Sequence, residues 1–209
     1  MNQLYKKIIA VLVSGLAIFA VYFGSYLPLK KSKTFINTMS SLNSSPSLVE
    51  FKETLSLPLD LPSPIGQEEL VRQVASLITN VINQPNINEE VVADLMNYIN
   101  KYYEPIINKG SGMSFGQNLY ILGSMNEVAF VKTNQTRYLE AAKKYYLKGL
   151  ELGPKRPQPL FGMFDVYRIE KNGEQTKTIG EQILSQWPNE ERTRQALAEF
   201  LKRSLTKNK

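Results

Sequence analysis

Two stretches of the chain decide the fold: AAKKYYLKGLELGPKRPQ at 141–158 and IGEQILSQWPNE at 179–190. Each ends near a proline, and Pro154 and Pro188 lie thirty-four residues apart. The residues before the two prolines match in position: Ala142, Tyr146 and Gly149 before Pro154, and Thr176, Gly180 and Ile183 before Pro188. Small residues let helices approach closely, and proline ends a helix because it lacks the backbone N–H. The spacing therefore predicts two successive helical hairpins.

The period and these positions resemble the tetratricopeptide repeat, a family of stacked helical hairpins. The resemblance runs from about Phe115 to the end of the chain. In the second unit the apolar positions of the first helix are Leu160, Met163, Phe164 and Tyr167, and Asn172 and Gly173 form the turn. The resemblance implies a scaffold that binds another protein or a peptide, without catalysis. An ordinary antiparallel helical bundle is the alternative interpretation.

The chain departs from the repeat pattern at three places. Phe164 stands where the family usually has a small residue, and Thr176 stands where it usually has alanine. The first unit is about seven residues too long, and we expect KTNQTR at 132–137 to form an elongated loop. Tyr146 is expected to pack into the next hairpin, whereas Tyr145 lies about 100° around the helix and is expected at the surface.

An uncharged run, IIAVLVSGLAIFAVYFGSYLPL at 8–29, comes near the N-terminus. At 1.5 Å per residue it reaches about 33 Å, enough to cross the hydrocarbon core of a bilayer. It is longer than the apolar part of a signal peptide and has no small-residue cleavage site, so residues 1–33 are predicted to be a retained membrane anchor. Two lysines precede the run and three follow it, which favours a single-pass protein with a cytoplasmic C-terminal part. The opposite orientation stays open.

The anchor is followed by a Ser- and Pro-rich linker at 34–64 and by a helical-repeat domain at 65–209. Ser47 is expected to cap a short helix at 48–57, and LPLDLPSP at 57–64 is expected to be an extended hinge. Beyond residue 65 the apolar residues recur at helical spacing, and Asn88 and Ser114 are expected to cap two of the helices. We expect helices at 67–82, from 89 to before Asn108, from 115, and at 138–152, 157–170, 175–186 and 189–205. The predicted fold class is all-α.

The composition excludes most catalytic chemistry. The chain has no Cys and no His, so disulfides, thiol nucleophiles, His-based general acids and nearly all zinc sites are ruled out. Glu89, Glu90 and Asp94 are read as partners of a helix N-terminus, and GSGMSFG at 110–116 is read as a plain loop because no Lys-Ser/Thr pair follows it. We therefore predict no enzymatic activity, no catalytic residue, no metal and no cofactor.

Candidate partner-binding residues are those of the first helices that face the hollow of the repeat. By helical periodicity these are Tyr120, Ser124, Glu127, Gln158, Phe161, Asp165 and Arg168. Phe161 and Arg168 are the strongest of them because such side chains dominate interface energies. The basic stretch 132–156 favours the solvated face of an amphipathic helix, and binding of a nucleic acid or an anionic lipid is the less favoured alternative.

The order of parts has a second resemblance. A span ending in lysines is followed by SLVEFKETLSLPLDLPSPIGQEELVRQVA at 47–75 and AAKKYYLKGLELGPKRPQPLFGMFDVY at 141–167. This resembles the C-terminal region of bacterial O-antigen ligase/polymerase family membrane proteins. The resemblance implies a place in cell-surface polysaccharide assembly, but the many-span catalytic body is not in this chain. The expected function is thus a membrane-anchored scaffold, and the alternative is a non-catalytic tail or subunit of such an enzyme.

Overall fold

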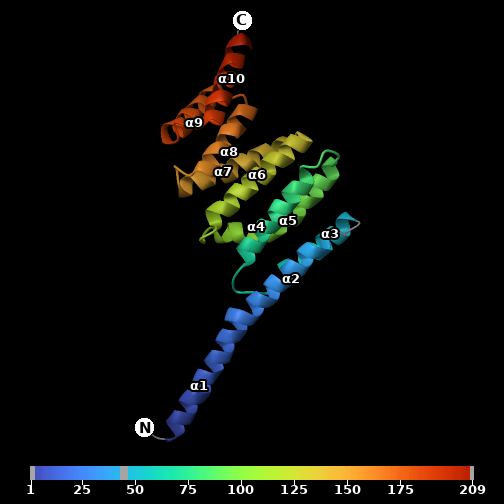
Figure 1. The fold of residues 1–209 in the computed structure, drawn as a ribbon, viewed down its shortest axis with the longest axis vertical. Coiled ribbons are helices and arrows are strands. Elements are labelled where there is room, and N and C mark those ends of the chain that lie inside the picture. The colour runs from blue at the N-terminus through green and yellow to red at the C-terminus, as the bar shows by residue number, and fades with distance from the viewer. Residues whose placement is uncertain (1–2, 43–46, 208–209) are drawn as a thin grey trace. The chain divides into compact units, whose positions relative to one another are not determined.

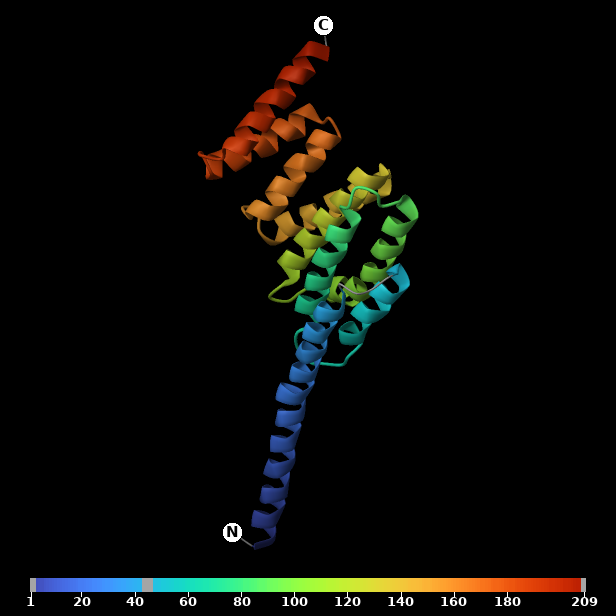
Figure 2. The ribbon, with the colours of Figure 1, turned by 45° about the vertical axis from the view of Figure 1, so that its right-hand side comes forward.

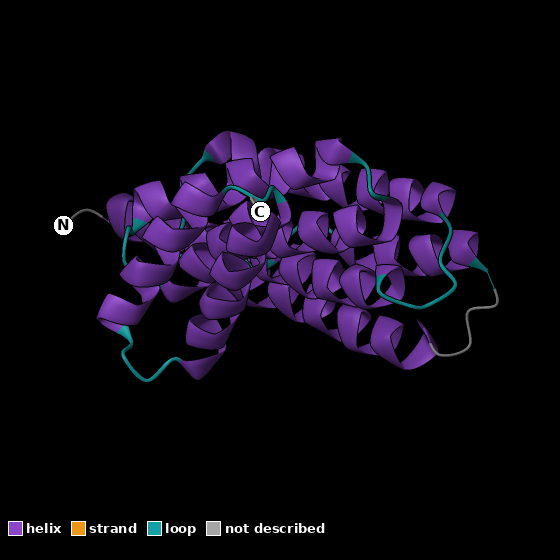
Figure 3. Ribbon diagram, turned by 90° about the horizontal axis from the view of Figure 1, so that it is seen from above, coloured by secondary structure: helices purple, strands orange, loops and turns teal. Residues whose placement is uncertain are grey.

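The computed structural model describes residues 3–42 and 47–207, and these fold into helices without a strand (Figure 3). The elements are α1 (Gln3–Val21), the π-helical turn η1 (Tyr22–Tyr26), α2 (Leu27–Ser41), α3 (Leu48–Leu59), α4 (Gln67–Ile82), α5 (Glu89–Lys109), α6 (Phe115–Thr133), α7 (Thr136–Leu152), α8 (Pro157–Ile169), α9 (Gly173–Gln186) and α10 (Glu191–Lys207) (Figure 1). The predicted all-α class is confirmed. The chain divides into two compact units, Met1–Val74 and Ala75–Lys209.

In the first unit, α1, η1 and α2 join into one continuous helix, Gln3–Ser41. Pro28 lies in the first turn of α2, directly after the π-helical turn η1. None of the residues of α1 is buried. Among the described residues this is the one helix that is long and apolar enough to cross a membrane, and its most apolar window of 18 residues has a mean hydropathy of 2.3.

Helix α3 lies beside α2 (Figure 2). As expected, the side chain of Ser47 caps it, accepting a hydrogen bond from the Glu50 N–H at 3.2 Å. Pro58 lies inside the last turn and cannot donate to the carbonyl of Thr54, four residues earlier. That carbonyl accepts from the Thr38 hydroxyl of α2 at 3.4 Å instead.

Two expectations for 34–64 need correction. Helix α2 continues through residues 34–41, which were expected to be linker, and α3 extends through Leu59, where an extended hinge was expected. Burial explains the second difference, because Leu55, Pro58 and Leu59 are all buried and the packing outweighs the low helix propensity of proline. The serines at 44 and 45 lie outside the described residues.

In the second unit, α5 shows the end signals that its sequence predicts. The side chain of Asn88 accepts a hydrogen bond from the Val91 N–H at 2.8 Å, and Gly110 ends the helix with a φ of 66°. Ser114 differs from the expectation. It occupies the N-cap position of α6, but its backbone is in the helical region (φ −94°, ψ 0°) and its side chain makes no capping hydrogen bond.

The predicted loop at 132–137 is wrong. Only Asn134 and Gln135 separate α6 from α7, and Asn134 turns the chain with a φ of 54°. The extra residues lengthen the helices instead: α6 and α7 have 19 and 17 residues, against 13 and 14 in α8 and α9. Polar side chains that look like loop residues bond back onto their own helix. Asn126 donates to the Leu122 carbonyl and Thr133 to the Ala129 carbonyl, both at 2.8 Å.

From α6 to α10 each helix packs on the next along the chain, and α6 also packs on α8. The core at the α6–α7–α8 junction holds Tyr146, which is 1% exposed as predicted. A methyl group added to Gly123 or Gly162 would lie 2.4 or 2.3 Å from its ring. The ring therefore packs against the bare backbones of α6 and α8. In the next hairpin the backbone of Gly180 packs against the side chains of Phe164 and Leu197. The absence of a side chain at Gly180 leaves space for the bulky ring of Phe164.

Candidate partner-binding hollow

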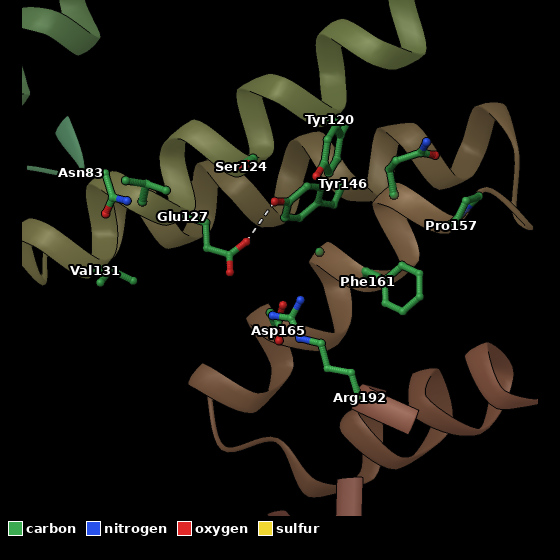
Figure 4. Close-up of a pocket in the computed structure, with 13 residues that line it drawn as sticks. Asn83, Tyr120, Ser124, Glu127, Val131, Tyr146, Pro157, Phe161, Asp165 and Arg192 are labelled. Carbon is green, nitrogen blue, oxygen red and sulfur yellow. Dashed lines mark hydrogen bonds between the residues drawn. The ribbon is translucent and has the colours of Figure 1, made fainter. Parts of the chain in front are cut away.

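A hollow of about 520 Å³ opens in the second unit where α6, α7 and α8 meet, with one side chain from α10 (Figure 4). We call it the α6–α8 hollow. Its lining residues are Asn83, Tyr120, Ser124, Glu127, Val128, Val131, Tyr146, Pro157, Gln158, Phe161, Gly162, Asp165 and Arg192. Aromatic rings and carboxylates thus share one concave surface.

Six of the seven predicted contact residues line this hollow. Tyr120, Ser124 and Glu127 come from one face of α6, at spacings of four and three residues, and Gln158, Phe161 and Asp165 come from one face of α8. Helical periodicity therefore brings together side chains from two successive hairpins.

Arg168 is the predicted residue that does not line the hollow. Its guanidinium pairs with Asp165 at 2.9 Å and lies over the ring of Phe164, 5.4 Å from the centroid. Arg168 lies three residues after Asp165 on α8, and residues at this spacing are neighbours on a helix surface. Arg168 is therefore next to the hollow and pairs with one of the carboxylates that line it.

The base of the hollow is a hydrogen-bonded pair. The hydroxyl of Tyr146 on α7 donates to Oε2 of Glu127 on α6 at 2.9 Å, and Figure 4 shows the two side chains pointing at one another. The ring of Tyr120 lies beside that of Tyr146, with centroids 6.3 Å apart. Because Tyr146 is fixed between Gly123 and Gly162, the carboxylate of Glu127 has a fixed donor.

Burial is the main cause of the altered acidity of Glu127. It raises the pKa of Glu127 to about 7, with a smaller contribution from the charge of Asp165, against the lowering effects of the Tyr146 hydrogen bond and Arg192. Burial and the nearby Glu127 carboxylate also raise the pKa of the Tyr146 phenol. A carboxyl group in the hollow therefore changes charge near neutral pH.

Sequence reasoning missed seven of the lining residues, and for different reasons. Val128 and Val131 continue the α6 face that already includes Ser124 and Glu127, so they follow once α6 is known to reach Thr133. Tyr146 was expected only in the core. Arg192 comes from α10, and its side chain reaches toward Asp165 (Figure 4); no local pattern places it there. Asn83, Pro157 and Gly162 complete the set.

Phe161 belongs to two surfaces. Its ring stacks with that of Trp187, with centroids 5.9 Å apart and an interplanar angle of 27°. The two rings also line a neighbouring hollow of about 410 Å³ formed with Pro157, Gln186, Pro188, Asn189 and Glu190. The aromatic side chains of Phe161 and Trp187 thus extend from the α6–α8 hollow toward the start of α10.

The basic stretch 132–156 is partly engaged within the chain. Lys143 pairs with Glu170 at 2.8 Å, and Lys132 donates to the Gln84 carbonyl at 3.0 Å. The ammonium of Lys148 lies over the ring of Phe115, 5.4 Å from the centroid. Lys132, Lys143 and Lys148 therefore have partners within the chain.

No protein-family model, curated protein or solved structure matches the chain. Among residues 3–42 and 47–207, no group of three or more acidic, His or Cys side chains is placed to hold a metal ion.

Proposed function

We propose that this chain is a single-pass membrane-anchored scaffold that binds a protein or peptide partner in the α6–α8 hollow. The observation that carries the proposal is the meeting of Tyr120, Ser124 and Glu127 with residues of α8 in one hollow. Aromatic side chains beside a few polar groups in a concave surface are typical of a recognition site.

As part of this proposal, the helices α6–α10 form a tetratricopeptide-like array. The pairs α6–α7 and α8–α9 are successive hairpins, their first helices pack on one another, and α10 packs on α9 after them. In helical-repeat proteins the first helices form the concave binding surface, and a last helix closes the stack. The thirty-four-residue spacing of Pro154 and Pro188 agrees with this arrangement.

The membrane part of the proposal rests on the helix Gln3–Ser41, whose apolar residues are exposed along α1. Apolar side chains that no protein surface covers are expected to face lipid. We propose residues 8–29 as the span, and a cytoplasmic position for the hollow from the three lysines that follow it.

Affinity capture tests the proposal. The full chain is solubilised with its native membranes in mild detergent, and bound proteins are compared between wild type and Phe161→Ala. We expect one partner to be retained by the wild type and by Lys177→Ala, an exposed change on α9, and to be lost with Phe161→Ala. Equal retention by all three chains would contradict binding in the hollow.

The process that we propose is cell-surface polysaccharide assembly, and it rests on the sequence resemblance of 47–75 and 141–167. In the alternative, the chain is the non-catalytic tail or subunit of an O-antigen ligase or polymerase whose catalytic part is another chain. Capture of a many-span membrane protein by the wild-type hollow would favour that alternative.

A further inference from the structure

The connection between α3 and α4 lies against the membrane helix. Leu61 and Pro62 of this segment, residues 60–66, line a hollow of about 370 Å³ together with Tyr22, Tyr26, Leu27 and Lys30 of the long helix. We call it the Tyr22 hollow. Ile65 and Gly66 of the same segment line a second hollow with residues of α2 and α4.

Buried hydrogen bonds hold this segment in place. The ammonium of Lys31, 5% exposed, donates to the Leu61 carbonyl at 2.6 Å and to the side-chain oxygen of Gln67. The amide of Gln67 in turn donates to the Leu59 carbonyl at 3.2 Å. Burial lowers the pKa of Lys31, although Asp60 opposes the shift. Lys31 therefore joins the two ends of the segment to α2.

The depth of the segment follows from the proposed span, on which this inference rests. Tyr26 and Tyr22 lie three and seven residues before Leu29, the end of the span, which is about 5–10 Å along the helix. Leu61 and Pro62 line the same hollow as these tyrosines, and the Leu61 carbonyl bonds to Lys31, two residues past the end of the span. The segment contains the charged Asp60 and the polar Ser63 beside four apolar residues, of which Ile65 is 61% exposed.

We propose that residues 60–66 insert into the interface of the bilayer, and that a phospholipid headgroup occupies the Tyr22 hollow. The chemistry of the lining matches such an occupant. Lys30 supplies a positive charge for the phosphate, and the stacked rings of Tyr22 and Tyr26, 5.5 Å apart, supply hydroxyl donors at a depth that tyrosine favours. Leu61 and Pro62 contact the upper part of the acyl chains.

Site-directed spin labelling tests the insertion, since the chain has no native cysteine. The full chain is placed in vesicles of phosphatidylcholine and phosphatidylglycerol, labelled in turn at Pro62→Cys, Val49→Cys and Leu16→Cys. Val49 is 61% exposed at the start of α3, and Leu16 lies in the span. We expect collisions with oxygen to dominate at positions 62 and 16, and collisions with a water-soluble nickel complex to dominate at 49.

Each outcome is decisive. A water-like label at 62, with a lipid-like label at 16, would overturn the insertion and leave the anchor intact. A water-like label at 16 would overturn the anchor and the insertion together.

Native mass measurement of the full chain in mild detergent tests the headgroup site. Phosphatidylglycerol should remain bound to wild type and to Lys33→Gln, an exposed lysine control, and should be lost from Lys30→Gln. Equal retention by Lys30→Gln would overturn the headgroup site.

Discussion

The hydroxyl of Tyr146 and the carboxylate of Glu127, nineteen residues apart in sequence, form a 2.9 Å hydrogen bond at the base of the α6–α8 hollow. The bond joins the two helices of one hairpin at the point where the next hairpin packs. It also connects the core of the second unit to its candidate binding surface, because one partner is 1% exposed and the other lines the hollow. Substitutions here therefore test packing and recognition together.

Stability should fall as pH rises from about 5 to 8. The pKa of Glu127 is raised from 4.5 to about 7 in the folded chain, so the folded state binds more protons than the unfolded state between these values. The protonated Glu127 carboxyl stabilises the folded chain. This stabilisation is complete below the pKa of Glu127 in the unfolded chain and is lost as the pH rises past the pKa of Glu127 in the folded chain. The difference between the two pKa values of Glu127 corresponds to about 3 kcal/mol of unfolding free energy.

Urea unfolding of wild type and Glu127→Gln across this pH range measures the effect. The free energy of unfolding of the wild type relative to the variant should decrease as pH rises, whereas Glu174→Gln, an exposed change on α9, should keep the wild-type profile. A wild-type profile parallel to that of Glu127→Gln would show that Glu127 does not titrate in this range.

Tyr146 and its neighbour Tyr145 test the phase of α7. Tyr146→Ala should cost roughly 3–5 kcal/mol of unfolding free energy, because it empties a fully buried site and removes the donor to Glu127. Tyr145 is half-buried rather than at the surface as expected, so Tyr145→Ala should cost about 1 kcal/mol. Chemical denaturation measures both, and an equal loss at the two sites would show that α7 is phased differently.

Gly162 should not tolerate alanine. A methyl group there would lie 2.3 Å from the ring of Tyr146, and Gly123 closes the other side, so the ring has no room to move. Overpacking of this kind costs about 1–3 kcal/mol, against about 1 kcal/mol gained from helix propensity. We expect a lower melting temperature for Gly162→Ala.

Two further variants identify the cause of that loss. Gly173→Ala adds a methyl group with no atom within 4 Å and should change stability by less than about 0.5 kcal/mol. Adding Tyr146→Ala to Gly162→Ala should cost less than the sum of the single changes, because the clash is then gone. If the stability losses of Gly162→Ala and Tyr146→Ala were additive, the ring of Tyr146 would not be the group that clashes with the added methyl.

Local patterns predict the helices and much of the hollow. The range predicted for α4 agrees with the structure, and Asn88 caps α5 as expected. The six predicted residues of the hollow follow from the 3.6-residue period together with the resemblance to a helical repeat. The period fixes which face of α6 or α8 a residue occupies, and the succession of hairpins brings the faces together.

The errors lie where long-range packing decides the outcome. Residues 132–133 look like loop, yet Thr133 is buried in α6 and bonded to Ala129. Pro58 looks like a helix breaker, yet the Thr38 hydroxyl satisfies the carbonyl that it leaves free. Arg192 reaches the hollow only because α10 packs on α9. Thr38 and Thr54 are sixteen residues apart, and no local pattern predicts their contact or the packing of α10 on α9.

Photo-crosslinking in native membranes tests the central claim most directly. A benzophenone amino acid replaces Ser124 in the hollow or, as the control, Lys177 on α9. We predict an adduct with one partner protein from position 124, its loss when Phe161→Ala is added, and no such adduct from 177. The absence of an adduct from 124, or the same adduct from both positions regardless of Phe161→Ala, would contradict the account.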